Sequence, residues 1–167
     1  MSRQHCTAAD VQRYPSSMHL LLALLLAQTE FPKSKELPPA NGYSHVVTTG
    51  PGKMIFISGQ VAMDREGKVV GVGDFRQQTE QALLNLKTAL AAAGADFNHV
   101  VKLNWYVKNF KPEQLPILRE VRARYLNKAN PPASTLAGVS ELFLPDVLIE
   151  VEAIAVIPSA GQSPNRK

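Results

Sequence analysis

Cysteine is almost absent from this sequence. The one cysteine, Cys6, excludes an internal disulfide framework and any zinc site built on several thiolates. Long apolar runs are missing too, because the longest, Met18 to Ala27, is too short to cross a bilayer in the ordinary way. The surplus of positive charge is small, with 18 Lys and Arg against 14 Asp and Glu, so the composition permits contact with nucleic acid without arguing for it.

The familiar catalytic and cofactor motifs are missing as well. There is no Gly-x-Ser-x-Gly nucleophile elbow, and the stretch 71–74 lacks the third glycine and the lysine of a phosphate-binding loop. After residue 27 only His45 and His99 remain as histidines, and neither has a partner at metal-ligand spacing. We therefore expect neither a metal nor a cofactor.

What the sequence contains is the composition of one globular domain. Its 167 residues are 45% apolar and 19% charged, which suits a folded chain and leaves no room for two full domains. We divide the chain into a leader (1–27), a proline-rich linker (28–42), a domain (43–157) and a flexible tail (158–167).

The leader has the parts of a secretory signal. Arg3 and Arg13 precede a short apolar core that ends in the small residue Ala27, where a cut is plausible. The polar part is long for a signal, so Met18 is an alternative start, and a short helix docked on the domain is the alternative structure. The signal interpretation predicts a secreted or periplasmic protein with no membrane anchor after cleavage; the alternative location is the cytoplasm.

Hydrophobic periodicity predicts an α+β domain with a mixed β-sheet and two helices packed on one face. Helices are expected from Asp74, an N-cap, to Gly94, and from 113 to 127. Strands are expected at 43–49, at 54–58 with an extension at 61–63, at 68–70 after a turn at 64–67, and at 100–107, 135–139 and 147–157.

The last predicted strand carries the best candidates for chemistry. Strand alternation places Glu150 and Glu152 on one face beside apolar residues. Two carboxylates in a cleft could transfer protons, because burial raises the pKa of a carboxyl. The alternative is a solvated or salt-bridged strip, which the pattern alone favours.

Several short motifs occur in one order along the domain: Tyr43-Ser44-His45, Ile57-Ser58-Gly59-Gln60-Val61, Gln78 with Asn85-Leu86, Gly94, Val100-Val101-Lys102, Pro132-Ala133-Ser134-Thr135 and Ile149-Glu150-Val151-Glu152-Ala153. Together they resemble the Rid (YjgF-like) family of enamine and imine deaminases, from about Tyr43 to Ile157. The resemblance implies a chorismate-mutase-like fold and a homotrimer, with small-molecule sites in clefts between subunits.

The resemblance also implies a reaction and its residues. Deaminating members hydrolyse the enamine or imine of a 2-keto acid to the keto acid and ammonia. By position, Glu150 is the catalytic acid, and Tyr43 and Gly59 line the cleft. The arginine that would hold the substrate carboxylate is replaced by Ser134, and Arg119 stands where an asparagine is common.

Three interpretations of that departure remain open. Arg119 or Arg122, three apart on the second helix, could supply the missing charge, although a solvated helix face opposite the apolar stripe is simpler. The pocket could accept a substrate without a carboxylate. The protein could also be a trimer that binds a small ligand without turnover.

RNA cleavage is a further alternative, because relatives have been described as ribonucleases. Basic residues gather in one region, at Lys108, Lys111, Arg119, Arg122, Arg124 and Lys128. The domain lacks a histidine pair for acid–base cleavage, and few aromatic residues lie near that region for base stacking. We therefore predict a small-molecule substrate and no nucleic-acid partner.

Overall fold

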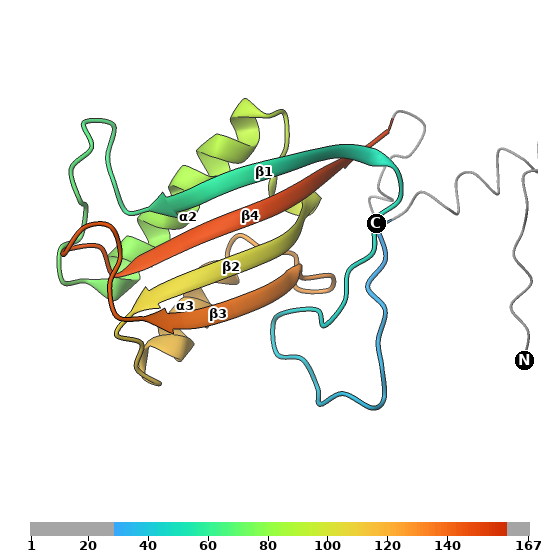
Figure 1. The fold of residues 1–167 in the computed structure, drawn as a ribbon. Coiled ribbons are helices and arrows are strands. Elements are labelled where there is room, and N and C mark those ends of the chain that lie inside the picture. Colours follow the sequence, from blue (N-terminus) through green and yellow to red (C-terminus); the bar gives the residue numbers. More distant parts are fainter. Residues whose placement is uncertain (1–28, 160–167) are drawn as a thin grey trace, which may run out of the picture.

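The computed structural model describes residues 29–159, which form a sheet covered by helices (Figure 1). The predicted leader lies outside the described residues, as does the end of the predicted tail. In chain order the elements are β1 (Gly52–Val61), α2 (Phe75–Ala92), the short 3-10 helix η2 (Phe97–His99), β2 (Val100–Lys108), α3 (Gln114–Arg122), β3 (Ala133–Val139) and β4 (Ile149–Pro158).

The four strands form one mixed sheet in the order β1-β4-β2-β3. The last strand, β4, enters the middle and pairs antiparallel with both β1 and β2, whereas β2 and β3 run parallel. Both α-helices lie behind this sheet in Figure 1, and no helix within residues 29–159 covers its other face. The predicted α+β class, with a mixed sheet and two helices on one face, is confirmed.

Helix α2 is the element that the sequence predicts most closely. The Asp74 side chain caps it by accepting a hydrogen bond from the backbone amide of Gln77 at 3.0 Å. Gly94, with a φ of 77°, follows its last turn in the left-handed conformation that favours glycine. One face of the helix is buried against the sheet, at Phe75, Gln78, Thr79, Ala82, Leu83, Leu86 and Leu90.

The core lies between that helix face and the inner face of the sheet. In β4 the alternation predicted from sequence holds, since Ile149, Val151 and Ala153 are buried in the core and Glu150 and Glu152 project from the opposite face. The strand therefore anchors the sheet with one set of side chains and presents carboxylates with the other.

Two buried or half-buried amides of α2 fix the neighbouring strand ends. Gln78 donates to the carbonyls of Asp146 (2.7 Å) and Gly71 (3.2 Å) and accepts from the Leu148 amide (2.8 Å), just before β4. Asn85 donates to the carbonyls of Val61 and Met63, both at 2.8 Å, at the end of β1. These amides explain why polar residues sit on an otherwise apolar helix face.

The first predicted strand is wrong: residues 43–49 form no strand. They make isolated bridges instead, from Ser44 to Ala133 and from Thr48 to Glu30. A ladder cannot extend beside Ser44, because Pro131 and Pro132 precede Ala133 and have no N–H to donate.

Three other element boundaries also differ from prediction. Residues 68–70 give only the bridge from Met63 to Val69, because left-handed turns at Gly67 and Gly71 flank this short segment. Helix α3 ends at Arg122, well before 127, because the chain tightens into i→i−3 hydrogen bonds after Val121. The last strand starts at Ile149, because the amide of Val147 bonds the Leu144 carbonyl in a turn.

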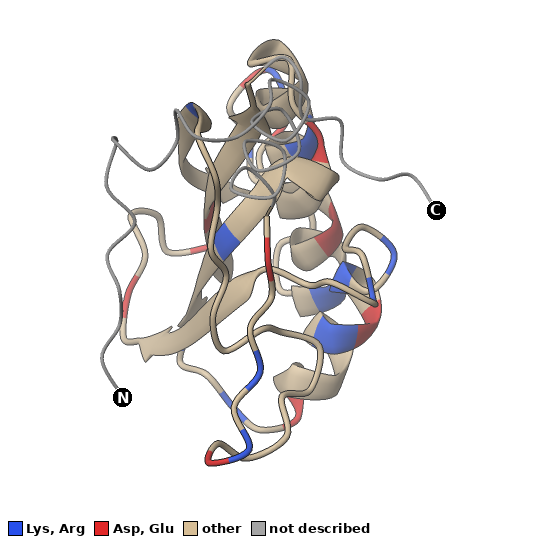
Figure 2. Cartoon of the chain, turned by 90° about the vertical axis from the view of Figure 1, so that its right-hand side faces the viewer, with Lys and Arg blue, Asp and Glu red and all other residues tan. Residues whose placement is uncertain are grey.

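Charged residues interleave along α2 and α3 (Figure 2). Arg76 pairs with Glu120 at 2.6 Å, and Arg124 pairs with Glu80 at 2.9 Å. Tyr125 also donates to Glu80, and partial burial together with that carboxylate raises the pKa of Tyr125 to about 12. Arg76 and Arg124 thus have acidic partners between the helices.

Candidate functional site

Glu150 lies directly over Gly59, where β1 departs from regular pairing. The register of β1 against β4 shifts between Ile57 and Gln60, so the segment around Gly59 leaves the ladder. A Cβ added to Gly59 would overlap Glu150 Oε1 and lie 2.5 Å from the carboxyl carbon. Only glycine therefore leaves room for the Glu150 carboxyl at this place.

The surroundings of Glu150 favour its protonated form. Burial raises the pKa of Glu150, and the nearby charge of Glu152 raises it further. Among residues 29–159, no side-chain donor is bonded to the Glu150 carboxyl. Glu150 thus keeps a proton at higher pH than an ordinary surface glutamate, as an acid for proton transfer requires.

Glu152 has a different environment on the same strand face. Asn104 donates to its Oε1 at 2.5 Å, and the Tyr106 hydroxyl donates to the same oxygen at 3.1 Å. That hydrogen bond raises the pKa of Tyr106. The two carboxyl groups are therefore not equivalent, since Glu152 is held by donors from β2 and Glu150 is left available.

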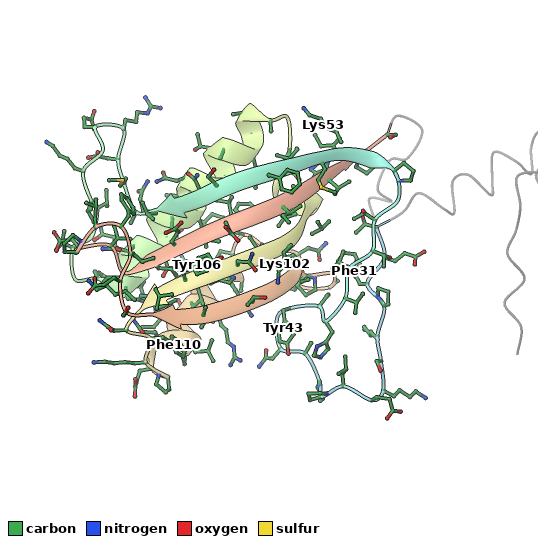
Figure 3. The ribbon with its side chains drawn as sticks, in the orientation of Figure 1. Phe31, Tyr43, Lys53, Lys102, Tyr106 and Phe110 are labelled. Carbon is green, nitrogen blue, oxygen red and sulfur yellow. The ribbon has the colours of Figure 1, made fainter. Side chains whose placement is uncertain are left out.

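The face that carries both glutamates is open in the single chain. Phe56 is 73% exposed and Met54 55% exposed, and a shallow groove of about 260 Å³ runs beside Glu152, lined by Phe56, Ile57, Ser58, Ala153 and Ile154. Lys102 and Tyr106 lie on this same face, turned toward the viewer in Figure 3. A polar strip with a carboxyl of raised pKa thus adjoins large exposed apolar side chains.

Within one chain, Ser134 and Glu150 lie on opposite faces of the sheet. It pairs in register with Leu103, whose side chain is buried on the helix side of the sheet. Its hydroxyl accepts a hydrogen bond from the indole N–H of Trp105 at 3.2 Å. The side chain that replaces the expected arginine therefore lies on the face opposite to Glu150.

Tyr43 lies near the start of β3 instead. Its ring meets His45 edge-on, with centroids 5.1 Å apart. The next residue, Ser44, donates through its hydroxyl to Pro131 O at 2.7 Å and through its amide to Pro132 O at 3.0 Å. Tyr43 is thereby held beside the segment that leads to Ser134, away from Gly59.

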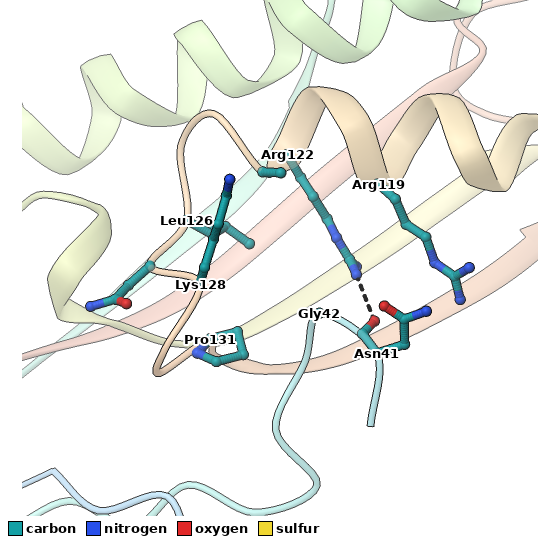
Figure 4. Close-up of a pocket in the computed structure, with 9 residues that line it drawn as sticks. Asn41, Gly42, Arg119, Arg122, Leu126, Lys128 and Pro131 are labelled. Atoms are coloured by element: carbon teal, nitrogen blue, oxygen red, sulfur yellow. Dashed lines mark hydrogen bonds between the residues drawn. The ribbon is translucent and has the colours of Figure 1, made fainter. Parts of the chain in front are cut away.

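Arg119 and Arg122 line a pocket of about 170 Å³ between α3 and the chain at Asn41 and Gly42 (Figure 4). The interpretation of a solvated helix face is wrong for Arg122, which is only 8% exposed because residues 41–42 fold over it. Its guanidinium donates to the Asn41 carbonyl at 3.1 Å. Gly42, at φ 75°, permits this contact, since a Cβ there would lie 2.5 Å from Arg122 Nη2.

The predicted site residues thus form two groups in the single chain. Glu150 and Gly59 share the open sheet face, and Tyr43, Ser134 and Arg119 belong to the region around β3 and α3. Sequence reasoning missed Asn41 and Gly42, which lay in the predicted linker, and the contacts of Asn104 and Tyr106 with Glu152. The alternating pattern placed the latter two on one face, but only the pairing of β2 with β4 shows their partner.

The part of the chain that the structure describes contains neither a membrane-spanning helix nor a cluster of metal ligands. No helix within 29–159 has the length and apolar character needed to span a membrane. Over the same range, no three His, Cys, Asp or Glu residues gather as a metal site would require.

Comparison with known proteins gives consistent matches across the domain. The sequence model of the family described as Endoribonuclease L-PSP matches residues 33–157. A RutC family protein of Pyrococcus horikoshii is 38% identical over 117 residues, covering 70% of this chain and 88% of the relative. A 2-iminobutanoate/2-iminopropanoate deaminase of Dermatophagoides farinae is 32% identical over 119 residues, covering 71% of this chain and 88% of that enzyme.

A solved structure gives a similar result. The Yersinia pestis protein YyfB, titled a protein of unknown function of the conserved Rid protein family, superposes with a TM-score of 0.74. It is 36% identical, and the match covers 78% of this chain and 99% of the Yersinia chain.

Proposed function

Since the chain belongs to the Rid (YjgF-like) family, the family matched under the description Endoribonuclease L-PSP, we propose that it hydrolyses small enamines or imines to a carbonyl compound and ammonia. The observation that carries this proposal is the Glu150 carboxyl, half-buried over Gly59 with a raised pKa. The name of the Dermatophagoides relative supplies the reaction class.

The chemistry needs a proton donor and a water molecule, and it involves no oxidation or reduction. The water oxygen attacks the imine carbon and forms a C–O bond, while the nitrogen takes up a proton. The amine nitrogen then takes up a second proton and the new hydroxyl gives up its own, so that the C–N bond breaks, the carbonyl forms and ammonia leaves. Glu150 in its protonated form can give a proton to the nitrogen, and its carboxylate form can take one from the attacking water.

The proposed active form is a homotrimer, because the single chain leaves the two groups of site residues apart. A neighbouring subunit on the open sheet face would cover Phe56 and Met54, which are otherwise exposed. It would also enclose Glu150 more fully and raise its pKa further. The resemblance to the family supports sites between subunits, where Glu150 of one chain would meet the β3 region of another.

Ser134 alters substrate choice in this proposal. A hydrogen bond to a charged group contributes about 1.5–3 kcal/mol, so losing the arginine at this position weakens binding of a simple 2-imino acid by roughly one to two decades. Attack of water on a protonated imine does not itself need that arginine, so the reaction can persist with a different substrate.

The second candidate is a trimer that binds a small ligand without turnover. It is favoured by the position of Ser134, whose hydroxyl accepts from Trp105 on the face opposite to Glu150 and supplies no charge for a substrate carboxylate. Ribonuclease activity is less supported, because two residues of the basic region are already paired, Lys108 with Glu141 and Arg124 with Glu80.

The decisive experiment generates imines in situ from several amino acids with an amino-acid oxidase and follows their loss with and without the purified protein. We expect accelerated loss, and we expect Glu150→Ala to abolish most of it. Glu66→Ala, which removes an acidic group from an exposed turn, is the matched control and should retain full activity. If no imine is lost faster than in buffer, the ligand-binding alternative is correct.

A companion variant, Ser134→Arg, restores the arginine that would hold the substrate carboxylate. Hydrolysis of 2-iminobutanoate should rise by roughly 10- to 100-fold if only the carboxylate anchor is missing. An unchanged rate would mean that the pocket differs in more than this residue.

A further inference from the structure

The pocket at α3 concentrates positive charge in a small space. Three of its lining residues are cations, Arg119, Arg122 and Lys128, and none of its lining residues is acidic. Its volume of about 170 Å³ is similar to that of cavities that hold a benzene-sized molecule. The space therefore suits a small molecule.

The arginines of this pocket differ from the other arginines on the helices. Arg76 and Arg124 each pair with a glutamate, whereas no Asp or Glu among residues 29–159 lies within 4.0 Å of Arg119 or Arg122. Arg122 is nearly buried, yet its one side-chain hydrogen bond goes to a neutral carbonyl of Asn41. A buried cation without a counterion is unfavourable, and such groups are normally paired.

The electrostatic surroundings agree with this geometry. Burial lowers the pKa of Arg122, and the nearby charge of Arg119 lowers it further. An anion that enters the pocket opposes both effects, because its negative charge stabilises the charged forms of Arg119 and Arg122. The arrangement is that of a prepared anion site, in which the protein accepts an unfavourable charge until the ligand is bound.

We propose that the Arg119–Arg122–Lys128 pocket binds a small organic dianion and that, in the reaction proposed above, this dianion is the substrate's own charged end. Each guanidinium group can donate two hydrogen bonds to a pair of oxygens on one anion. A single carboxylate would neutralise only one of the pocket's three positive charges. The substrate class is then an imine that carries a further carboxylate or a phosphate. This part of the inference rests on the proposed function, whereas binding of the dianion does not.

Binding is measured first, with the full chain and defined probes. Inorganic phosphate, succinate and acetate are titrated calorimetrically at constant ionic strength, because screening would otherwise differ between them. We expect phosphate or succinate to bind at least about tenfold more tightly than acetate, and Arg119→Gln to weaken that binding by about 10- to 100-fold. Arg124→Gln, which removes an arginine that faces Glu80, is the matched control and should bind as the wild type does.

Arg122 is tested by stability as well as by binding. Arg122→Met removes a nearly buried, unpaired cation, so the ligand-free melting temperature should stay the same or rise. The rise in melting temperature that phosphate gives the wild type should be lost in this variant. A lower ligand-free melting temperature with phosphate stabilisation intact would show that Arg122 is only structural and would overturn the proposal.

Hydrolysis then separates this inference from the proposed function. The imine of aspartate should be hydrolysed faster than 2-iminobutanoate, and Arg119→Gln should remove the difference. Binding of phosphate that depends on Arg119, without hydrolysis of any imine, would support the site and refute the reaction. Equal hydrolysis of both imines, unaffected by Arg119→Gln and with no phosphate binding, would refute the site and support the reaction.

Discussion

Gly59 carries only a hydrogen atom where other residues carry a Cβ, and this leaves room for the Glu150 carboxyl. Gly59→Ala would place a methyl group on the carboxyl oxygen and displace the side chain. We expect imine hydrolysis to fall by at least about tenfold, and the free energy of unfolding to fall by about 1–3 kcal/mol, as in other overpacked sites. Steady-state kinetics and urea denaturation measure the two effects.

A double-mutant cycle shows whether this cost comes from the carboxyl. In the Glu150→Ala background the added methyl meets no carboxylate, so Gly59→Ala should destabilise the protein much less there. An equal loss of stability in both backgrounds would contradict the close approach of these two residues.

Glu150 should also lower stability at neutral pH. Its pKa is raised on folding, so between its ordinary value of 4.5 and the folded value the native state holds a proton that the unfolded state has released. Stability therefore falls as pH rises through that window. Glu150→Gln should unfold at a higher urea concentration than the wild type at pH 7, and the difference should shrink below pH 4.5. A difference that is independent of pH would disprove the raised pKa.

At the scale of elements, α2 holds the strand ends around the site. Gln78→Met keeps the bulk of the side chain but leaves the Asp146 carbonyl and the Leu148 amide without partners. We expect the free energy of unfolding to fall by about 2–4 kcal/mol, measured by chemical denaturation. The neighbouring Gln77→Met is exposed and should change stability by less than about 0.5 kcal/mol; a similar loss in both variants would argue against the buried amide.

The sequence predicts some elements well because their signals are local. Helix α2 has its cap, its apolar face and its stop within one continuous segment, and β4 shows its two faces in its own alternation. Residues 43–49 alternate equally well but meet a segment that begins with two prolines, so their pairing depends on a distant part of the chain. The end of α3 was also missed, because the apolar spacing continues past Arg122 while the backbone tightens into i→i−3 hydrogen bonds.

The candidate site also has a part that the sequence predicts and a part that it does not. Its acidic face could be predicted because Glu150 and Glu152 alternate with buried residues in one strand. The contact between Glu150 and Gly59 depends on an irregular register between two strands far apart in the chain. The burial of Arg122 depends on residues 41–42 folding over a helix, and no periodic pattern predicts such a contact.

At the scale of the whole molecule, the open sheet face should determine assembly. Phe56→Asp would place a charge at the centre of the exposed apolar patch, and we expect the proposed trimer to dissociate, as light scattering after gel filtration would show. Imine hydrolysis should fall with it. Val72→Asp, at an exposed apolar residue in a glycine-flanked loop, is the control and should leave the mass unchanged. A wild-type protein that is already a monomer would contradict both the assembly and the enclosed Glu150.

The two amides of α2 have a consequence for how such a domain can diversify. They hold the end of β1 and the segment before β4 from the helix side of the sheet, opposite to the face that carries Glu150. Neither amide forms a hydrogen bond with β3 or α3, where Ser44 and Arg122 instead hold residues 41–44 in place. Substitutions around β3 and α3 can therefore accumulate without disturbing the hydrogen bonds that position the strand ends near Glu150.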